Sequence, residues 1–168
     1  MKKPTNISGF SLVELMVVIG VIALMAAIAT PSLMAWLPNV RFRDASRGML
    51  VDVQLAKMTA IQRNANVVTT FQANGSGYTI FVDNGGGVAA NINNNTQDAG
   101  EQIIRTITMP NNVVLSLNSP AGPFAPVPVL VFRPTGLPAG AAAVNVYNNQ
   151  SNHNAVLTVS VAGSIRSQ

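Results

Sequence analysis

Cysteine is absent from this chain of 168 residues, and charged side chains make up only 10% of it. The lack of cysteine excludes a disulfide framework and thiolate metal sites. A single histidine leaves little material for histidine-based catalysis or metal binding. The formal net charge is only +4, and Lys2 and Lys3 contribute two of the positive charges. The high isoelectric point therefore reflects scarce charges and not a basic surface built for nucleic acid.

One long uncharged stretch dominates the N-terminal part of the chain. Glu14 is the only charged side chain between Lys3 and Arg41, at the start of an apolar run of about 20 residues that as a helix would span roughly 30 Å. A charge within a membrane helix costs about 2.5 to 3.5 kcal/mol on insertion scales, so it is normally paired or functional. Cleavage between Gly9 and Phe10 would create a positive amino terminus one helical turn from Glu14. Two such helices side by side could pair Glu14 of one copy with the terminal amine of the next.

Residues 9–15, behind a short basic leader, resemble the class III signal of type IV pilins and pseudopilins. The resemblance implies cleavage after Gly9 by a prepilin peptidase, N-methylation of Phe10, and a Glu14 that sets subunit register in a helical filament. Residues 1–9 would then be the cleaved leader, and residues 10–30 the transmembrane helix that becomes the filament core. The implied partners are other pilins or pseudopilins, the peptidase and an inner-membrane assembly platform, with membrane lipid around the helix before assembly.

The same region also fits a conventional secretory signal, because residues 27–29 read Ala-Ile-Ala, an A-x-A cleavage pattern. Under this alternative, cleavage after Ala29 would release a soluble β domain that begins at Thr30. The apolar run is longer than the roughly 7 to 15 residues usual for a signal core. An acidic residue early in such a core is also unexplained, so we favour the pilin-like interpretation.

Positive charges precede the apolar run, and none follows until Arg41, which places the N-terminus in the cytoplasm and the rest in the periplasm of a bacterial cell. Pro31 removes a backbone donor and is expected to bend or open the helix. In pilins, a proline at this place marks a region that can melt during assembly. Residues 31–66 are predicted to continue as a periplasmic helix, with one apolar face for packing on a globular domain: Phe42, Ala45, Met49, Val53, Ala56 and Ala60.

Residues 67–168 are predicted to form an antiparallel β domain, because short β-like runs alternate with turn residues. The expected strands are 67–72, 78–82, 103–109, 113–117, 129–132, 143–147, 156–161 and 164–166. Two polar loops, 83–100 and 118–128, are expected to be mobile. The predicted fold class is therefore α+β, a long N-terminal helix followed by a mainly antiparallel two-sheet domain of pseudopilin type.

Several segments of this region, taken in order, resemble the GspH/FimT group of minor pseudopilins and minor pilins. They are residues 43–63, 81–84, 100–105, 131–136 and 159–166. The resemblance implies a structural subunit at the tip of a type II secretion pseudopilus or a type IV pilus, supporting protein secretion or pilus biogenesis. Which of the two machines it serves stays open.

A DNA-uptake role is the further alternative, because some relatives in the FimT branch hold DNA with an arginine-rich C-terminal turn. Here Ser164 stands where an arginine is common, so Arg166 is the one candidate DNA contact. A phosphate-binding surface normally needs several cations, and we therefore do not expect nucleic acid as a partner.

No motif indicates catalysis. His153 lies in an Asn/Ser-rich loop without Asp, Glu or Cys nearby in the sequence, and residues 85–87 form a glycine run that lacks the lysine of a phosphate-binding loop. The Asn cluster after Asn91 has Gln102, not Glu, at the twelfth position of a would-be calcium loop. We expect a subunit with no enzymatic activity, cofactor or metal.

Overall fold

The computed structural model describes residues 10–117 and 129–167, apart from the side chains of residues 31, 32 and 35. The chain divides into two compact units between Leu37 and Pro38. The predicted leader, including Gly9, and the predicted loop 118–128 lie outside the described residues.

A single helix, α1, runs from Leu12 to Arg63, a length of 52 residues. It continues through Pro31 and Pro38 without interruption, so the local opening expected at Pro31 is not found in this structure. A proline removes its own N–H from the helical ladder, and its ring crowds the carbonyl four residues earlier, but the other residues of the turn keep their N–H donors. Beside Pro31, the Thr30 hydroxyl donates to the carbonyl of Ala26 at 2.7 Å. Melting at Pro31 during filament assembly stays a prediction.

The second unit contains two antiparallel sheets. Its strands are β1 (Asn66–Phe71), β2 (Gly77–Asp83), β3 (Ile103–Thr108), β4 (Val113–Leu117), β5 (Val129–Phe132), β6 (Ala142–Asn148), β7 (Asn154–Val159) and β8 (Ile165–Ser167). Sheet A has the order β3-β2-β1-β5, and sheet B has the order β4-β6-β7-β8. Two short 3-10 helices, η1 (Gly85–Gly87) and η2 (Ala89–Asn91), lie between β2 and β3. The predicted fold class is confirmed, and β7 begins two residues earlier than the sequence suggests.

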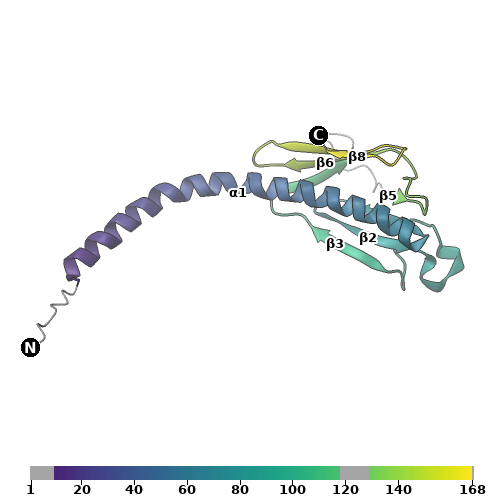
Figure 1. Ribbon diagram of the computed structural model, residues 1–168, viewed down its shortest axis with the longest axis horizontal. Helices are drawn as coiled ribbons and strands as arrows, with labels where there is room; N and C mark the ends of the chain where they lie inside the picture. The colour runs from purple at the N-terminus through teal and green to yellow at the C-terminus, as the bar shows by residue number, and fades with distance from the viewer. Residues whose placement is uncertain (1–9, 118–128, 168) are drawn as a thin grey trace, which may run out of the picture. The chain divides into compact units, whose positions relative to one another are not determined.

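The core of this unit is shared by the helix and both sheets. In Figure 1 the C-terminal part of α1 lies along the sheets. Phe42, Met49, Val53, Ala56 and Ala60 are buried together with strand residues of sheets A and B, and Ala45 packs against them. The predicted apolar face is confirmed, because residues three and four apart on a helix share one side.

Candidate functional site

The start of α1 combines an exposed aromatic residue, a hydrogen-bonded first turn and an acidic side chain. Phe10 precedes the helix and is 77% exposed. The Ser11 hydroxyl accepts the backbone N–H of Glu14 at 3.2 Å, which is how an N-cap satisfies a free donor in the first turn. Ser11 and Glu14 also have the spacing of a capping box, a signal that can be read directly from the sequence. Glu14 therefore lies where the positive end of the helix dipole favours an acid.

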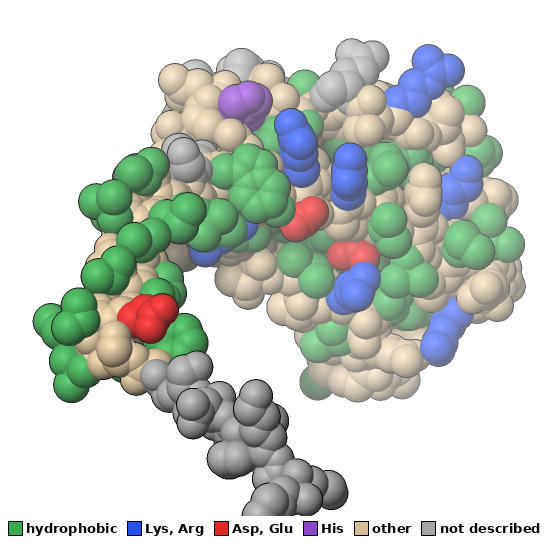
Figure 2. Space-filling view, turned by 60° about the vertical axis from the view of Figure 1, so that its left-hand side comes forward, with side chains coloured by type: hydrophobic (Ala, Val, Ile, Leu, Met, Phe, Trp, Pro, Cys, Tyr) green, Lys and Arg blue, Asp and Glu red, His purple; other side chains and the backbone are tan. Residues whose placement is uncertain are grey.

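From Leu12 to Thr30 the helix is long and apolar enough to cross a membrane, and none of it is buried in the protein. In Figure 2 the N-terminal part of the helix is covered with hydrophobic side chains, and one acidic side chain lies among them. The carboxylate of Glu14 has no ion-pair partner among the described residues. This arrangement leaves both the apolar surface and the charge free to meet another molecule.

In the second unit, Asp52 fastens α1 to sheet A. Asp52 is only 2% exposed. Its Oδ2 accepts the Tyr78 hydroxyl of β2 at 2.7 Å, and its Oδ1 forms an ion pair with Arg105 of β3. Burial, and then the hydrogen bond to Asp52, raise the pKa of Tyr78 well above its ordinary value of 10.0. Helical periodicity does not single out Asp52, although a carboxylate beside the apolar face needs such partners.

Lys57 fastens α1 to sheet B. Its Nζ donates to the carbonyl of Gly163 at 2.8 Å, in the turn between β7 and β8. Gly163 has φ +76°, and a Cβ there would lie 3.2 Å from the carbonyl oxygen of Gly136. Gly136 also has φ +76°, and a Cβ there would lie 2.6 Å from Ile61 Cδ1 of the helix. Both glycines belong to segments that carry the family resemblance. Each lies in a left-handed turn next to α1, a backbone conformation that favours glycine.

Two buried carboxylates order the loop between β2 and β3. Asp83, 1% exposed, accepts the backbone N–H groups of Asn93 and Asn95, each at 2.8 Å. Glu101, 8% exposed, accepts those of Gly85 at 2.8 Å and Asp98 at 3.0 Å. The sequence predicts a mobile loop, and its mobility stays a prediction. The structure shows that backbone N–H groups within the loop donate hydrogen bonds to the two carboxylates at its ends. The oxygens of both carboxylates therefore accept hydrogen bonds from backbone N–H groups of the loop.

The C-terminal turn carries Arg166 on β8, where its side chain is exposed and has no ion pair within the described part of the chain. The nearby Lys57 is committed to the Gly163 carbonyl. Lys and Arg side chains are scattered over the face shown in Figure 2 and do not form one patch. His153 lies with its ring 6.2 Å from that of Phe42, measured between centroids. The structure does not bring it together with an acidic partner among the residues described.

Comparison with known families gives two matches that together cover most of the chain. Residues 45–163 match the family described as Type II transport protein GspH. Residues 4–30 match the prokaryotic N-terminal methylation motif. No curated protein sequence matches the chain.

Solved structures share the fold at low sequence identity. The minor pseudopilin EpsH from the type 2 secretion system of Vibrio cholerae is 13% identical, with a TM-score of 0.55 over 75% of this chain and 94% of that one. The type IV minor pilin FimU of Pseudomonas aeruginosa PAO1 is 14% identical, with a TM-score of 0.55 over 77% of this chain and 90% of that one.

Proposed function

The chain belongs to the GspH family of type II transport proteins and is a pilin-like structural subunit, and from this premise we propose how it is processed and assembled. A prepilin peptidase cuts between Gly9 and Phe10, and the new amino group of Phe10 is methylated. The mature subunit is first anchored in the inner membrane by its apolar helix. It is then incorporated at the tip of a type II secretion pseudopilus or a type IV pilus.

The observation that carries this proposal is the lone acid at the start of an unburied apolar helix. In the filament the helix exchanges lipid contacts for contacts with neighbouring helices, which gives little net hydrophobic gain. Register must then come from packing and from polar pairs. Glu14 of one subunit and the Phe10 amine of an adjacent subunit form such a pair, and each neutralises a charge that is costly in an apolar surrounding.

The β domain faces the periplasm and contacts other minor subunits in this proposal. The family is structural, and we propose no catalytic step. The exported domain acts as a structural part of the assembly. The hydrogen bonds of Asp52 and Lys57 support this role, because they attach the β-sheets to the helix that assembles.

Mass spectrometry of the mature N-terminus tests the processing step. The chain is expressed in cells with and without a prepilin peptidase, and we expect a methylated Phe10 terminus only where the peptidase is present. A matched variant, Gly9→Val, should keep its leader in both strains, because a branched side chain replaces the small residue at the cut.

A terminus at Thr30 would contradict the proposal and support the alternative of a soluble domain released after Ala29. A chain that retains residues 1–9 beside an active peptidase would contradict both alternatives. The two outcomes are separated by mass, because the cuts remove segments of different length.

A further inference from the structure

A pocket lies on the second unit where α1 ends and the loop between β2 and β3 begins. It is enclosed by the residues that follow the helix, the adjoining ends of β1 and β2, that loop, and the turn after β5. Its volume is about 300 Å³, which is at the lower end of the range of roughly 300 to 1,000 Å³ usual for small-molecule sites. An occupant of this pocket would therefore be small.

Four asparagines line the pocket: Asn64, Asn66, Asn84 and Asn93. Asn66 is half-buried, and the other three are exposed. Each side-chain amide offers two N–H donors and one carbonyl acceptor. Among these acceptors, Asn84 Oδ1 accepts the backbone N–H of Gly86 at 3.3 Å. A ligand hydroxyl both donates and accepts hydrogen bonds, so several hydroxyls on one small molecule would match this set of amides.

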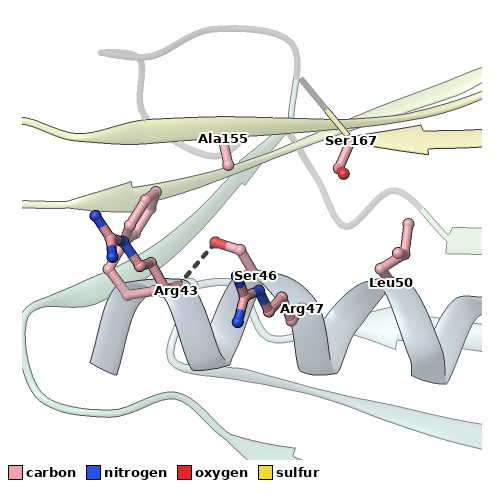
Figure 3. Close-up of a pocket in the computed structure, with 7 residues that line it drawn as sticks. Arg43, Ser46, Arg47, Leu50, Ala155 and Ser167 are labelled. Atoms are coloured by element: carbon pink, nitrogen blue, oxygen red, sulfur yellow. Dashed lines mark hydrogen bonds between the residues drawn. The ribbon is translucent and has the colours of Figure 1, made fainter. Parts of the chain in front are cut away.

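The pocket offers no available charge to a ligand. Asp83 is the one ionisable residue among the described residues that line it, and it is 1% exposed. Its two oxygens already accept the backbone N–H groups of Asn93 and Asn95. The pocket in Figure 3, between α1 and sheet B, differs in this respect, because Arg43 and Arg47 line it. A charged ligand in the asparagine pocket would lose hydration without meeting an opposite charge.

The remaining lining residues are apolar: Ala65, Ile92 and Pro134. Ile92 is 50% exposed, so part of its side chain is accessible to a ligand. Apolar surface favours C–H groups over hydroxyls, because covering it removes both surfaces from water. A sugar ring presents C–H groups on its faces and hydroxyls around its rim. Its chemistry therefore matches a pocket in which amides and apolar side chains occur together.

We propose that this pocket binds one neutral pyranose ring, either as a free sugar or as one unit of a polysaccharide. The amides of Asn64, Asn66 and Asn93 bind the hydroxyls, and Ile92 and Pro134 cover C–H groups. An acyclic polyol would use the amides but would present no ring face to the apolar residues. This site is separate from the assembly role proposed above, and the single chain contains all of it.

NMR titration of the full chain, isotope-labelled at asparagine, tests this proposal. The detergent is a polyoxyethylene ether, because its headgroup contains no sugar. The probes are methyl glucopyranoside, N-acetylglucosamine and the linked trimer of N-acetylglucosamine. Sorbitol is the acyclic control, and glucuronate is the anionic control. The side-chain amide signals of Asn64, Asn66 and Asn93 report on the pocket itself, so that glucuronate bound elsewhere, near Arg43 or Arg47, is not counted.

We expect saturable shifts of these signals by at least one pyranose, with a Kd below about 10 mM. Sorbitol and glucuronate should bind at least roughly tenfold more weakly. The double variant Asn64→Gly/Asn93→Gly, followed through Asn66, should weaken the sugar by a similar factor. Both residues have left-handed backbones, with φ of 49° and 62°, which glycine adopts without strain. Asn112→Gly is the matched control, since Asn112 has φ 69° and does not line the pocket.

The trimer identifies the source of the sugar. Binding of the trimer as tight as that of the single ring indicates a polysaccharide unit, whereas binding of the single ring alone indicates a free sugar. Either result supports a pyranose site.

Three results would overturn the proposal. The first is the absence of saturable shifts with every pyranose, in a chain shown to be folded by circular dichroism. The second is equal binding of sorbitol or glucuronate at the same asparagine signals, which would exclude recognition of a neutral ring. The third is unchanged sugar binding by a folded Asn64→Gly/Asn93→Gly variant, which would exclude the amides as its ligands.

Discussion

At the scale of single residues, the few acids and bases of this protein have distinct tasks. Asp52 and Lys57 bind the helix to the two sheets, and Glu101 binds backbone N–H groups in a loop. Glu14 differs from them, because its backbone N–H is capped by Ser11 while its side chain has no ion-pair partner in the described chain. Its charge is therefore available for a contact between subunits.

Glu14 can act through its charge or through the first turn of the helix, and two substitutions separate these roles. Glutamine retains the hydrogen-bonding capacity of the capping box but not the charge, whereas alanine loses both. If the charge pairs with the Phe10 amine, Glu14→Gln and Glu14→Ala should both reduce incorporation into sheared filaments, by at least about tenfold, because an unpaired charge is left buried. Quantitative immunoblots of filament and membrane fractions measure this ratio.

Ser11→Ala is the control for the capping role. It removes the hydroxyl that accepts the Glu14 N–H, costs about 1 kcal/mol of helix stability, and leaves the charge in place. Normal assembly of Glu14→Gln together with poor assembly of Ser11→Ala would show that capping, and not charge pairing, is what the filament requires.

Tyr78 predicts how stability depends on alkaline pH. Burial raises its pKa in the folded protein above the ordinary value of 10.0. Below pH 10 the phenol keeps its proton in both states, so its contribution to stability is constant. Above that pH the unfolded chain loses the proton first, and the free energy of unfolding should fall by up to about 1.4 kcal/mol per pH unit for this group.

Denaturant unfolding of the full chain in detergent between pH 8 and pH 11 measures this slope. Tyr78→Phe should remove this part of the slope and, at neutral pH, lower stability by about 1 to 3 kcal/mol, because Asp52 loses a donor while buried. Tyr147→Phe is the matched control, because its hydroxyl bonds the exposed Asn152. An unchanged alkaline slope in Tyr78→Phe would contradict the assignment.

At the scale of elements, α1 has a different environment on each part of its length. The part from Leu12 to Thr30 is unburied, and the part beyond Pro38 supplies one wall of a domain core. Periodicity alone predicts the buried face, because Phe42, Met49 and Val53 repeat at helical spacing. It does not reveal which glycines of the protein can be replaced and which are required by the backbone conformation.

Gly48 and Gly163 should therefore respond to alanine with opposite signs. A Cβ at Gly48 meets nothing within 4 Å, and the residue lies inside α1, so Gly48→Ala should stabilise the protein by about 0.5 to 1 kcal/mol. Gly163→Ala should destabilise it by about 1 to 2 kcal/mol, since φ is +76° and the Cβ would lie 3.2 Å from a carbonyl oxygen. Urea unfolding midpoints of the two variants give the comparison, and a shift of the same sign in both would contradict it.

At the scale of the whole molecule, much of the fold could be predicted from local patterns. The strands alternate with turn residues at short intervals, and their positions are correct to within about two residues. Tertiary contacts were harder to foresee, because Asp52 meets Tyr78 and Arg105 across long stretches of sequence. The same is true of Glu101, whose carboxylate accepts backbone N–H groups of Gly85 and Asp98 in the preceding loop.

The absence of cysteine makes the proposed orientation in the membrane directly testable. Single cysteines are introduced as Ser164→Cys in the β domain and Lys3→Cys in the leader, with the parent chain as an unlabelled background. In cells with a permeabilised outer membrane, a membrane-impermeant maleimide should label the chain carrying Ser164→Cys. The chain carrying Lys3→Cys, in cells without prepilin peptidase, should react only after lysis. The reverse pattern would place the β domain in the cytoplasm.

The contacts of Asp52 and Lys57, which attach α1 to the two sheets, affect how the protein withstands mechanical force. Asp52 holds sheet A and Lys57 holds sheet B, and the two residues lie five positions apart on one helix. A force applied along the helix axis is therefore shared between two independent contacts, one with each sheet. We expect that breaking one of them lowers the rupture force without freeing the opposite sheet.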